Sequence, residues 1–573
     1  MYERNESWRI KDANGLYSRQ ASGTPELGEP TGRYGLLCPN SGYRSYVKSQ
    51  LNHLASNYEF EGVFIDMAFW PKVCYCESCR SRWEAGEMPR IVDWNDGRWN
   101  AFQHKRERWL HEFEVFCTDV LKKANPALTV SHQCSSVSRN WVLAASEDYV
   151  DACDYAAGDF YEGPTEQGII CKLFNSLTGS FEFMTSRCVN LRDHTTKKPL
   201  ELIKLQAFIA LAHKGAFLHI DAIDPSGEID IQAYEDLGAV LKEFELYEKY
   251  LGGELIADVA ILFDSNSKMD FRENGMDVTN VGWVPFPHIR QVAATARVLK
   301  ERHIPFTVIA AKNLKNASYK AIVLTGVSRL SEESAEDIRE YVRNGGAVYA
   351  SGDCARLEDV LGFKHLSKFE HDTYISPELG IPIFSKDRPM QAGIQSKVEA
   401  LPSAKVLASI MLPITDPGDF TKFASIHSNP PGKRTEYPAV IANEYGKGRT
   451  LWMAGSIESM GEKEQSDAFV KAIAYLTGGS YSHFLEAPPV AEAICFDAGD
   501  YILASILNVQ PTLPAVALHG ARLSVDLKGR SVRKALLLPE EKELPFEVKD
   551  GYARIELPPI NLLAMVIIRV SEQ

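Results

Sequence analysis

The chain has 573 residues, 45% of them apolar, which is ordinary for a globular protein and long enough for roughly two to four domains. Its formal net charge of −14 argues against a nucleic acid or an anionic membrane as its partner. No apolar run reaches the ~18 residues of a membrane span, so no membrane segment is expected.

The first residues and the cysteine content indicate a reducing compartment. The sequence begins Met-Tyr-Glu-Arg-Asn-Glu, without the apolar stretch of a secretory signal. Eleven cysteines is an odd number, and four of them cluster, which is not typical of a disulfide framework. We therefore expect a cytoplasmic protein.

The first convincing elements follow a polar, glycine-rich stretch at residues 1–37. A helix is expected over 44–58, and a strand over 62–66 comes directly after it. Val63, Phe64 and Ile65 form a short apolar run, which predicts a buried strand with Asp66 at its carboxyl end. The carboxyl end of a buried parallel strand is where α/β barrels keep their chemistry.

Strands and helices then alternate up to about residue 250. Further strands are expected at 128–132, 149–159, 180–185 and 216–221, with helices at 94–123, 199–214 and 231–250. This alternation predicts a parallel sheet. The five strands look like the last five of an eight-stranded (β/α)8 TIM-type barrel, which needs about 250 residues. We expect residues 1–252 to form a partial catalytic barrel that lacks its first three strands.

Two further domains are expected after the barrel. Residues 253–480 alternate again, with strands near 258–263, 306–310, 321–325 and 347–351 and a loop-rich stretch at 355–440, which predicts a doubly wound, flavodoxin-like α/β domain. It contains no GxGxxG and no P-loop, so no organic cofactor is expected. Short alternating strands punctuated by proline and glycine in residues 481–573 predict a β-sandwich.

Three cysteines follow the first strand as a CxCxxC motif, formed by Cys74, Cys76 and Cys79. Thiolates at this spacing can converge on one soft cation, and Zn²⁺ takes four ligands. We expect the fourth to be Cys38. Four cysteine ligands make a closed, structural zinc site rather than a catalytic one. The alternative is that these are separate buried thiols.

Carboxylates at the predicted strand ends are the candidate catalytic residues. Glycoside hydrolysis needs two carboxyl groups that flank the scissile bond. Glu182 lies between Phe181 and Phe183, and apolar surroundings raise the pKa of a glutamate and suit a general acid. The alternatives for Glu182 are an ion pair with Arg187 or an outward orientation. Asp66 is the second candidate, and its alternative role is to cap a loop.

Other residues near the strand ends are candidates for contacts with a sugar. Trp70 and Tyr161 offer faces for stacking, although ordinary core packing explains them equally well. His132 can bind a sugar hydroxyl or be a satisfied core histidine. The remaining candidate substrate-binding residues are polar groups at strand ends, Asp159, Glu162, Arg187 and Asp221; Asp221 can also cap or support the last barrel loop.

Two family resemblances meet in this sequence. Cys38-Pro-Asn-Ser-Gly-Tyr-Arg44 together with Cys74-Tyr-Cys-Glu-Ser-Cys79 resembles the zinc loop of family 42 β-galactosidases, and the domain from residue 256 resembles their trimerisation domain. The strand Val63-Phe-Ile-Asp66 resembles the nucleophile strand of family 29 α-L-fucosidases. The stretches Gly158–Gln167, Phe181–Thr185 and His219–Ile229 resemble later motifs of that family, in the same order.

A family that joins both features is the family 151 α-L-fucosidases, within the hypothetical glycosyl hydrolase group. This resemblance implies a retaining α-L-fucosidase in which Asp66 is the nucleophile and Glu182 the acid and base. In the family 42 arrangement the roles swap and the substrate is a β-galactoside. A third reading is a carbohydrate-binding or scaffold protein without catalysis, because the barrel is incomplete. The middle domain implies a homo-oligomer, either a trimer or a dimer.

Overall fold

The structure is a computed structural model that describes most of the chain. The described residues are 1–17, 19–20, 34–66, 73–93, 95–133, 147–159, 163–190, 193–221, 226–268, 275, 277–278, 287–354, 356–378, 381–384 and 388–571. Within these residues, no helix combines the length and the apolar character needed to cross a membrane.

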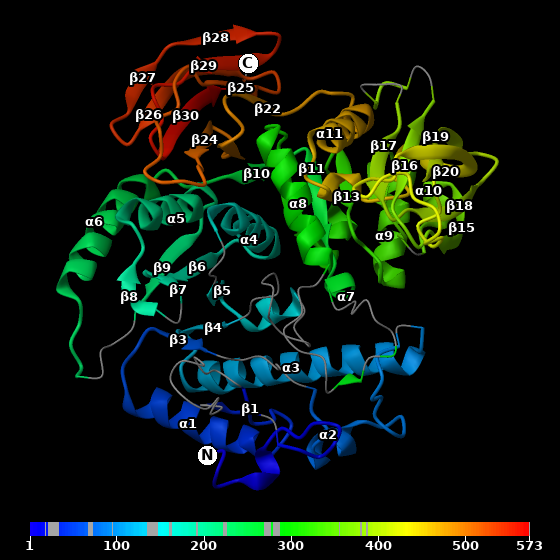
Figure 1. Ribbon diagram of the computed structural model, residues 1–573. Coiled ribbons are helices and arrows are strands. Elements are labelled where there is room, and N and C mark those ends of the chain that lie inside the picture. Colours follow the sequence, from blue (N-terminus) through cyan, green and yellow to red (C-terminus); the bar gives the residue numbers. More distant parts are fainter. Residues whose placement is uncertain are drawn as a thin grey trace.

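The amino-terminal part of the molecule is built on five parallel strands (Figure 1). They are β3 (Gly62–Ile65), β4 (Thr129–His132), β5 (Ala156–Asp159), β6 (Phe181–Ser186) and β9 (Ala216–Ile220). β3 pairs with β4, and β5, β6 and β9 form a second ladder. A parallel bridge between Gln133 and Ala157 joins the two, so the strands follow one another in chain order.

Long helices alternate with these strands, and the sequence predicts each of them except the one over 164–177. They are α1 (Tyr43–Asn57), α3 (Gly97–Ala124), α4 (Pro164–Leu177), α5 (Leu200–Ala212) and α6 (Ile231–Glu248). The long helix α3 begins where the side chain of Asp96 accepts a hydrogen bond from the backbone N–H of Arg98 at 2.8 Å, which caps its first turn. Its apolar residues Phe113 and Cys117 pack against Val130 of β4 and form a core on one face of the sheet.

The outer strands of this sheet correct one expectation. β3 was expected to be buried, but it alternates between exposed and half-buried residues, and Phe64 is 36% exposed. β9 is similarly open. Within the described residues no strand pairs with the outer edge of β3 or β9, so these two strands lack the neighbour that would bury them.

Local structure on either side of β5 and β6 also differs from the prediction. The stretch expected as a strand over 149–159 begins as a 3₁₀ helix (Glu147–Ala152), and only β5 is extended. After β6 the chain forms a hairpin of β7 (Cys188–Asn190) and β8 (Asp193–Lys197) before α5. The hairpin lies beyond the carboxyl end of β6, where it borders the region that a barrel uses for catalysis.

The middle part has the predicted doubly wound sheet. Its parallel strands, in spatial order, are β12 (Phe306–Ala310), β11 (Val259–Phe263), β13 (Ala321–Leu324), β14 (Ala347–Ser351) and β21 (Gly448–Met453). The order is that of a flavodoxin-like sheet, with the second strand outside the first. Helices α8 (Pro287–Glu301), α9 (Glu332–Arg343) and α11 (Lys463–Thr477) accompany it.

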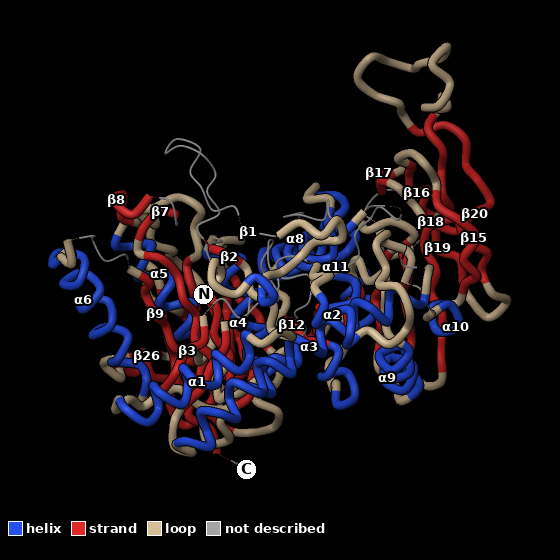
Figure 2. Tube along the Cα trace, turned by 90° about the horizontal axis from the view of Figure 1, so that it is seen from below, coloured by secondary structure: helices blue, strands red, loops and turns tan. Residues whose placement is uncertain are grey.

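The stretch expected to be loop-rich instead contains several strands. Residues 355–440 contain β15 (Phe363–Lys368), β16 (Thr373–Pro377), β17 (Met390–Gly393), β18 (Ser396–Ala400), β19 (Lys405–Pro413) and the start of β20 (Pro431–Tyr445). β20, β19, β16 and β17 extend the parallel sheet by antiparallel pairing. The loop that joins β19 to β20 projects from the body of the molecule (Figure 2).

The carboxyl-terminal part is two packed antiparallel sheets, as predicted. One sheet has the order β10-β23-β24-β30-β26-β27 and the other β22-β25-β29-β28. The first comprises β10 (Glu254–Ile256), β23 (Ala491–Asp497), β24 (Tyr501–Asn508), β30 (Leu563–Ser571), β26 (Ser531–Leu538) and β27 (Lys542–Leu544). The second comprises β22 (His483–Glu486), β25 (Arg522–Asp526), β29 (Tyr552–Glu556) and β28 (Phe546–Lys549).

Candidate active site

The orientation of each strand identifies the side chains on the inner face of the five-stranded sheet. Val130 belongs to the core that the sheet forms with α1 and α3, so it points outward toward the helices. Successive residues of a strand alternate between faces. Val63 is in register with Val130, so it also points outward. Phe64 is the next residue and points to the inner face. The same alternation, continued past Ile65, gives Asp66 the inner direction too.

The register of the ladders puts Asp66 and Glu182 on one row across the sheet. Ile65 pairs with His132, so the next row holds Asp66 and Gln133. Gln133 pairs with Ala157, and Ala157 pairs with Glu182. Paired residues of parallel strands share a face, so both carboxylates point to the inner side of the sheet. Three strand spacings separate them, roughly 14 Å along the sheet.

Glu182 itself corrects one expectation and settles one alternative. It was expected at a strand end, but it is the second residue of β6, because the extended run continues to Ser186. It forms no ion pair with Arg187, which pairs with Asp221 instead. Burial raises the pKa of the Glu182 carboxyl above its ordinary value. Asp66 lies in the turn directly after β3 and is exposed.

His132 lies on the outer face, so it does not join this row. The ring is fully buried, and its Nε2 atom is 2.9 Å from the hydroxyl of Thr118 on α3. Burial lowers its pKa to about 4, so the ring is neutral at physiological pH. The expected contact with a sugar is therefore replaced by a contact with a helix.

Arg187 and Asp221 also face each other rather than an open site. The guanidinium of Arg187 donates through Nε to a carboxylate oxygen of Asp221, and both side chains are largely buried. A second carboxylate, that of Asp230, lies 3.8 Å from Arg187 Nη1. This arrangement ties the residue after β6 to the residue after β9. It supports the strand ends from outside the inner face.

The remaining expected contact residues lie partly outside what the structure describes. Asp159 is the last residue of β5, and only its main chain is described. Trp70, Tyr161 and Glu162 fall outside the described residues.

Several polar residues near the site were not expected from the sequence. Gln133 and Ser186 lie on the inner face by the same alternation that orients Glu182, and both are almost fully buried. On the outer side, the ammonium of Lys198 donates to the Thr185 hydroxyl at 2.9 Å, and burial lowers the pKa of Lys198 to about 8. The period-two pattern from Glu182 to Ser186 is the signal that identifies the inner face.

The four predicted cysteine ligands come together in the structure. Cys38 follows β2 (Tyr34–Gly35), and the other three precede or begin α2 (Glu77–Arg82). Their sulfur atoms lie within 4.8 Å of one another, and all four side chains are buried. Tetrahedral coordination with Zn–S bonds near 2.3 Å places sulfur atoms roughly 3.8 Å apart. The Cys38 and Cys79 sulfurs are 3.4 Å apart, so the cluster fits such an ion with little adjustment.

The surroundings of the cluster also favour a metal. Contacts among the four thiols lower the pKa of Cys76 but raise the pKa of Cys38 and of Cys79. The side-chain amide of Asn40 points a donor at the sulfur of Cys79, 3.4 Å away. Donors to sulfur stabilise thiolates, which are the form that binds zinc.

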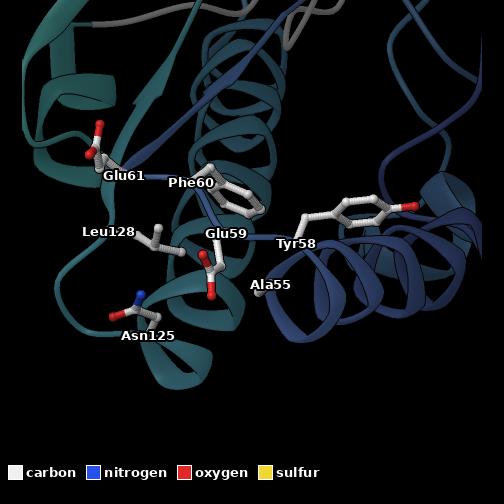
Figure 3. Close-up of a pocket in the computed structure, with 7 residues that line it drawn as sticks. All are labelled: Ala55, Tyr58, Glu59, Phe60, Glu61, Asn125 and Leu128. Carbon is white, nitrogen blue, oxygen red and sulfur yellow. The ribbon is translucent and has the colours of Figure 1, made fainter.

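A pocket at the other end of β3 is not the catalytic face. It has a volume of about 500 Å³ and opens below the amino ends of β3 and β4 (Figure 3). It is lined by Ala55, Tyr58, Glu59, Phe60, Glu61, Asn125 and Leu128. Parallel barrels carry out chemistry at the opposite, carboxyl ends of their strands. The pocket is therefore excluded as the candidate active site.

One family model matches the middle part of the chain. Residues 257–476 match the family described as the beta-galactosidase trimerisation domain. No protein with a curated description matches the sequence significantly.

Solved structures resemble the whole chain in fold. An α-L-fucosidase isoenzyme 2 from Paenibacillus thiaminolyticus aligns over 100% of this chain and 86% of its own, with a TM-score of 0.78 and 17% identity. A β-galactosidase from Bacillus circulans sp. alkalophilus covers 99% and 87%, with a TM-score of 0.69 and 15% identity. One from Rahnella sp. R3 covers 94% and 83%, with a TM-score of 0.64 and 17% identity. The chain therefore has the fold of these TIM-barrel-type glycosidases.

Proposed function

We propose that the protein is a retaining glycoside hydrolase of the α-L-fucosidase type. The observation that carries the proposal is the row that holds Asp66 and Glu182 on the inner face of the parallel strands. In an eight-stranded barrel, three strand steps turn the direction of a side chain by roughly 135°, so two such carboxylates point toward each other across the interior. In retaining glycosidases the two opposed carboxyl groups are about 5–5.5 Å apart.

In the proposed reaction Asp66 is the nucleophile, and Glu182 is first the acid and then the base. Asp66 attacks the anomeric carbon and forms a glycosyl ester, while Glu182 gives its proton to the departing oxygen of the aglycone. Glu182 then takes a proton from water, whose oxygen displaces Asp66 from the anomeric carbon. Burial raises the pKa of Glu182, which is the direction that a general acid needs.

A second candidate substrate is a β-galactoside. The match of residues 257–476 to a β-galactosidase domain and the two β-galactosidase structures favour it. In that case Glu182 is the nucleophile and Asp66 the acid. The motifs around Asp66 and Glu182 favour the fucosidase.

Nucleophile replacement separates the two assignments. With nitrophenyl glycosides as substrates, Asp66→Gly is expected to be inactive and to form a glycosyl azide when azide is added. Glu182→Ala is expected to keep turnover of substrates with good leaving groups and to lose it on poor ones. Glu245→Ala, at an exposed position of α6, is the control. Azide rescue of Glu182→Ala in place of Asp66→Gly contradicts the fucosidase assignment. Binding without turnover of any nitrophenyl glycoside contradicts both assignments.

We also propose a structural zinc ion at the four cysteines, a cytoplasmic location and self-association through the middle part. The zinc rests on the fit of the cysteine cluster. The location rests on cysteines that are all free in the described part of the chain. The proposal of a homo-oligomer, either a trimer or a dimer, rests on the match to the trimerisation domain. The matched residues include the projecting β19–β20 loop.

A further inference from the structure

A second concave surface lies away from the barrel, between the middle part and the sandwich. This groove has a volume of about 650 Å³. The end of α8, the end of α11 and the outer face of the sheet β22-β25-β29-β28 line it, and Figure 1 shows β22 next to α11. None of its lining residues belongs to residues 1–252, so a ligand bound there lies apart from Asp66 and Glu182.

Strand register arranges three different side chains in one row on the floor of the groove. Phe484 of β22 pairs with Ser524 of β25, and Ser524 pairs with Arg554 of β29. Paired residues share a face of the sheet, so an aromatic ring, a hydroxyl and a guanidinium lie side by side. Tyr552, two residues before Arg554, lies on the same face one row further along.

The aromatic rings of the groove are held in place by the protein. The Phe484 ring centroid lies 5.5 Å from that of Tyr552 and 5.9 Å from that of Tyr481. The hydroxyl of Tyr552 donates to the backbone carbonyl of Tyr481 at 2.8 Å. Phe484 nevertheless stays 37% exposed, although it is surrounded by rings that could have covered it. A fixed, open aromatic face is a platform for the C–H face of a flat ligand.

The charges around this platform balance. Arg302 and Arg554 contribute two guanidinium groups, and Glu486 and Asp550 contribute two carboxylates. Among the described residues, Arg554 forms one ion pair, with Asp550 at 3.4 Å, and Glu486 forms one, with Arg522 at 3.3 Å. Both groups therefore keep hydrogen-bonding capacity toward the groove. Donors and acceptors without net charge complement a neutral ligand rich in hydroxyl groups rather than an ion.

We propose that this groove is a non-catalytic saccharide-binding site, in which a sugar ring stacks on Phe484 and its hydroxyls bond to Arg554, Ser524 and Glu486. A pyranose has an apolar face of C–H groups and an equatorial rim of hydroxyls, which is the pattern that the floor presents. The volume accommodates about two sugar units. The site would hold a polysaccharide to the protein while the barrel acts elsewhere on it.

The test is affinity electrophoresis of the full chain through gels that contain β-1,4-galactan or fucosylated xyloglucan. We expect at least one of these polysaccharides to retard the protein. Phe484→Ala should weaken the retardation at least tenfold in dissociation constant, and Arg554→Ser should weaken it too. The matched control is Phe546→Ala, because Phe546 lies in the same sheet, is 36% exposed and does not line the groove.

Two measurements keep this result separate from the proposed hydrolysis. Turnover of small nitrophenyl glycosides should be the same in Phe484→Ala as in the parent, since no residue that lines the groove belongs to residues 1–252, which hold Asp66 and Glu182. Retardation that depends on Phe484 supports the site even if no glycoside is hydrolysed. Absence of retardation by both polysaccharides, equal retardation of Phe484→Ala and Phe546→Ala, or a change in oligomer mass with Phe484→Ala in place of lost retardation, overturns it.

Discussion

At the scale of single residues, burial changes the acidity of two glutamates of the barrel part in the same direction but for different uses. Glu182 faces the inner side of the sheet and forms no ion pair within the described residues, so its raised pKa suits the proton transfer proposed for it. Glu147 lies in the 3₁₀ helix before β5, and Ser265 of the middle part donates a hydrogen bond to its carboxylate. Burial raises the pKa of Glu147 to about 7. The raised pKa of Glu147 affects the free energy of unfolding.

Glu147 predicts that the protein loses stability as the pH rises from about 4.5 to 7. In the unfolded chain the carboxyl ionises near 4.5, whereas in the folded chain it keeps its proton up to about 7. The contribution is fully present below pH 4.5 and falls through this window, by about 3 kcal/mol in total. Glu147→Gln cannot ionise, so urea denaturation midpoints between pH 4.5 and 7 should be flatter for the variant. Parallel profiles for variant and parent contradict the prediction.

The sequence predicts the chemistry of single residues better than their direction. The CxCxxC spacing, together with Cys38, is enough to predict that the four cysteines come together, because three of them are close in sequence and form a recognisable motif. His132 and Arg187 also lie near strand ends, but which face they take depends on strand register and helix contacts. Those contacts, such as Thr118 on α3, are long-range and leave no mark in the local pattern.

At the scale of elements, the cysteine cluster joins the start of α1 to α2. Cys38 lies shortly before α1, and Cys79 lies within α2. Both segments belong to the main core through these cysteines, and we expect bonds to a zinc ion to add to that packing. A structural zinc contributes folding free energy directly, because the sites do not form in the unfolded chain.

Replacement of one ligand should release the metal. We expect the purified protein to contain about one zinc per chain by mass spectrometry of the metal, and Cys38→Ser to contain much less and to melt at a lower temperature. Cys171→Ser, at a buried free cysteine of α4, is the matched control and should keep its zinc. If both variants hold equal amounts of metal, the cluster is not a zinc site.

Elements with strong periodicity could be predicted, and short antiparallel strands could not. The alternation of helices and strands across 43–248 has long amphipathic helices to mark it. Apart from α4 and the 3₁₀ helix before β5, the structure places the main elements within a few residues of the prediction. The strands β15 to β19 are separated by proline, glycine and serine, and they are stabilised by pairing with distant strands. Their local sequence therefore resembles loops.

At the scale of the whole molecule, a buried ion pair connects the barrel part to the sandwich. Lys172 of α4 and Glu492 of β23 are 2.9 Å apart, with side chains 3% and 10% exposed. His213, the residue directly after α5, also contacts Lys172, at 3.0 Å. Burial alone would raise the pKa of Glu492, but Lys172 and Lys300 hold it at about 2. The parts of the chain are thus fixed to one another by charge as well as by packing.

Removing one partner of this pair should destabilise the protein strongly. Lys172→Met leaves the Glu492 carboxylate buried without its main counter-charge, which costs about 3–5 kcal/mol. The double variant Lys172→Met/Glu492→Leu should recover much of the loss. Lys204→Met, which breaks the half-exposed pair between Lys204 and Glu243, should cost less than about 1 kcal/mol. Urea denaturation measures all three, and equal losses for the two single lysine variants contradict the role of burial.

Contacts within one chain do not account for the exposed apolar side chains of the β19–β20 loop. Its base is firm, since the Tyr374 hydroxyl donates to the carbonyl of Asn429 at 2.6 Å and the Asn429 amide donates to the carbonyl of Thr415 at 2.7 Å. Beyond the base, Phe420 is 95% exposed, and Phe423 and Ile426 are 72% and 81% exposed. Apolar side chains presented together on a firm support are typical of a protein interface.

Because the loop lies within the matched trimerisation domain, we expect its tip to pack against a second copy of the chain. Burial of three such side chains contributes roughly 5 kcal/mol or more, so their loss should weaken association about a thousandfold. Sedimentation velocity of Phe420→Ser/Phe423→Ser/Ile426→Ser should show a smaller species than the parent at the same concentration, with an unchanged melting temperature of the folded chain. Val516→Ser removes an apolar side chain that is 73% exposed on the sandwich and should leave the mass unchanged. A triple variant with the mass of the parent would show that the tip does not carry the contact.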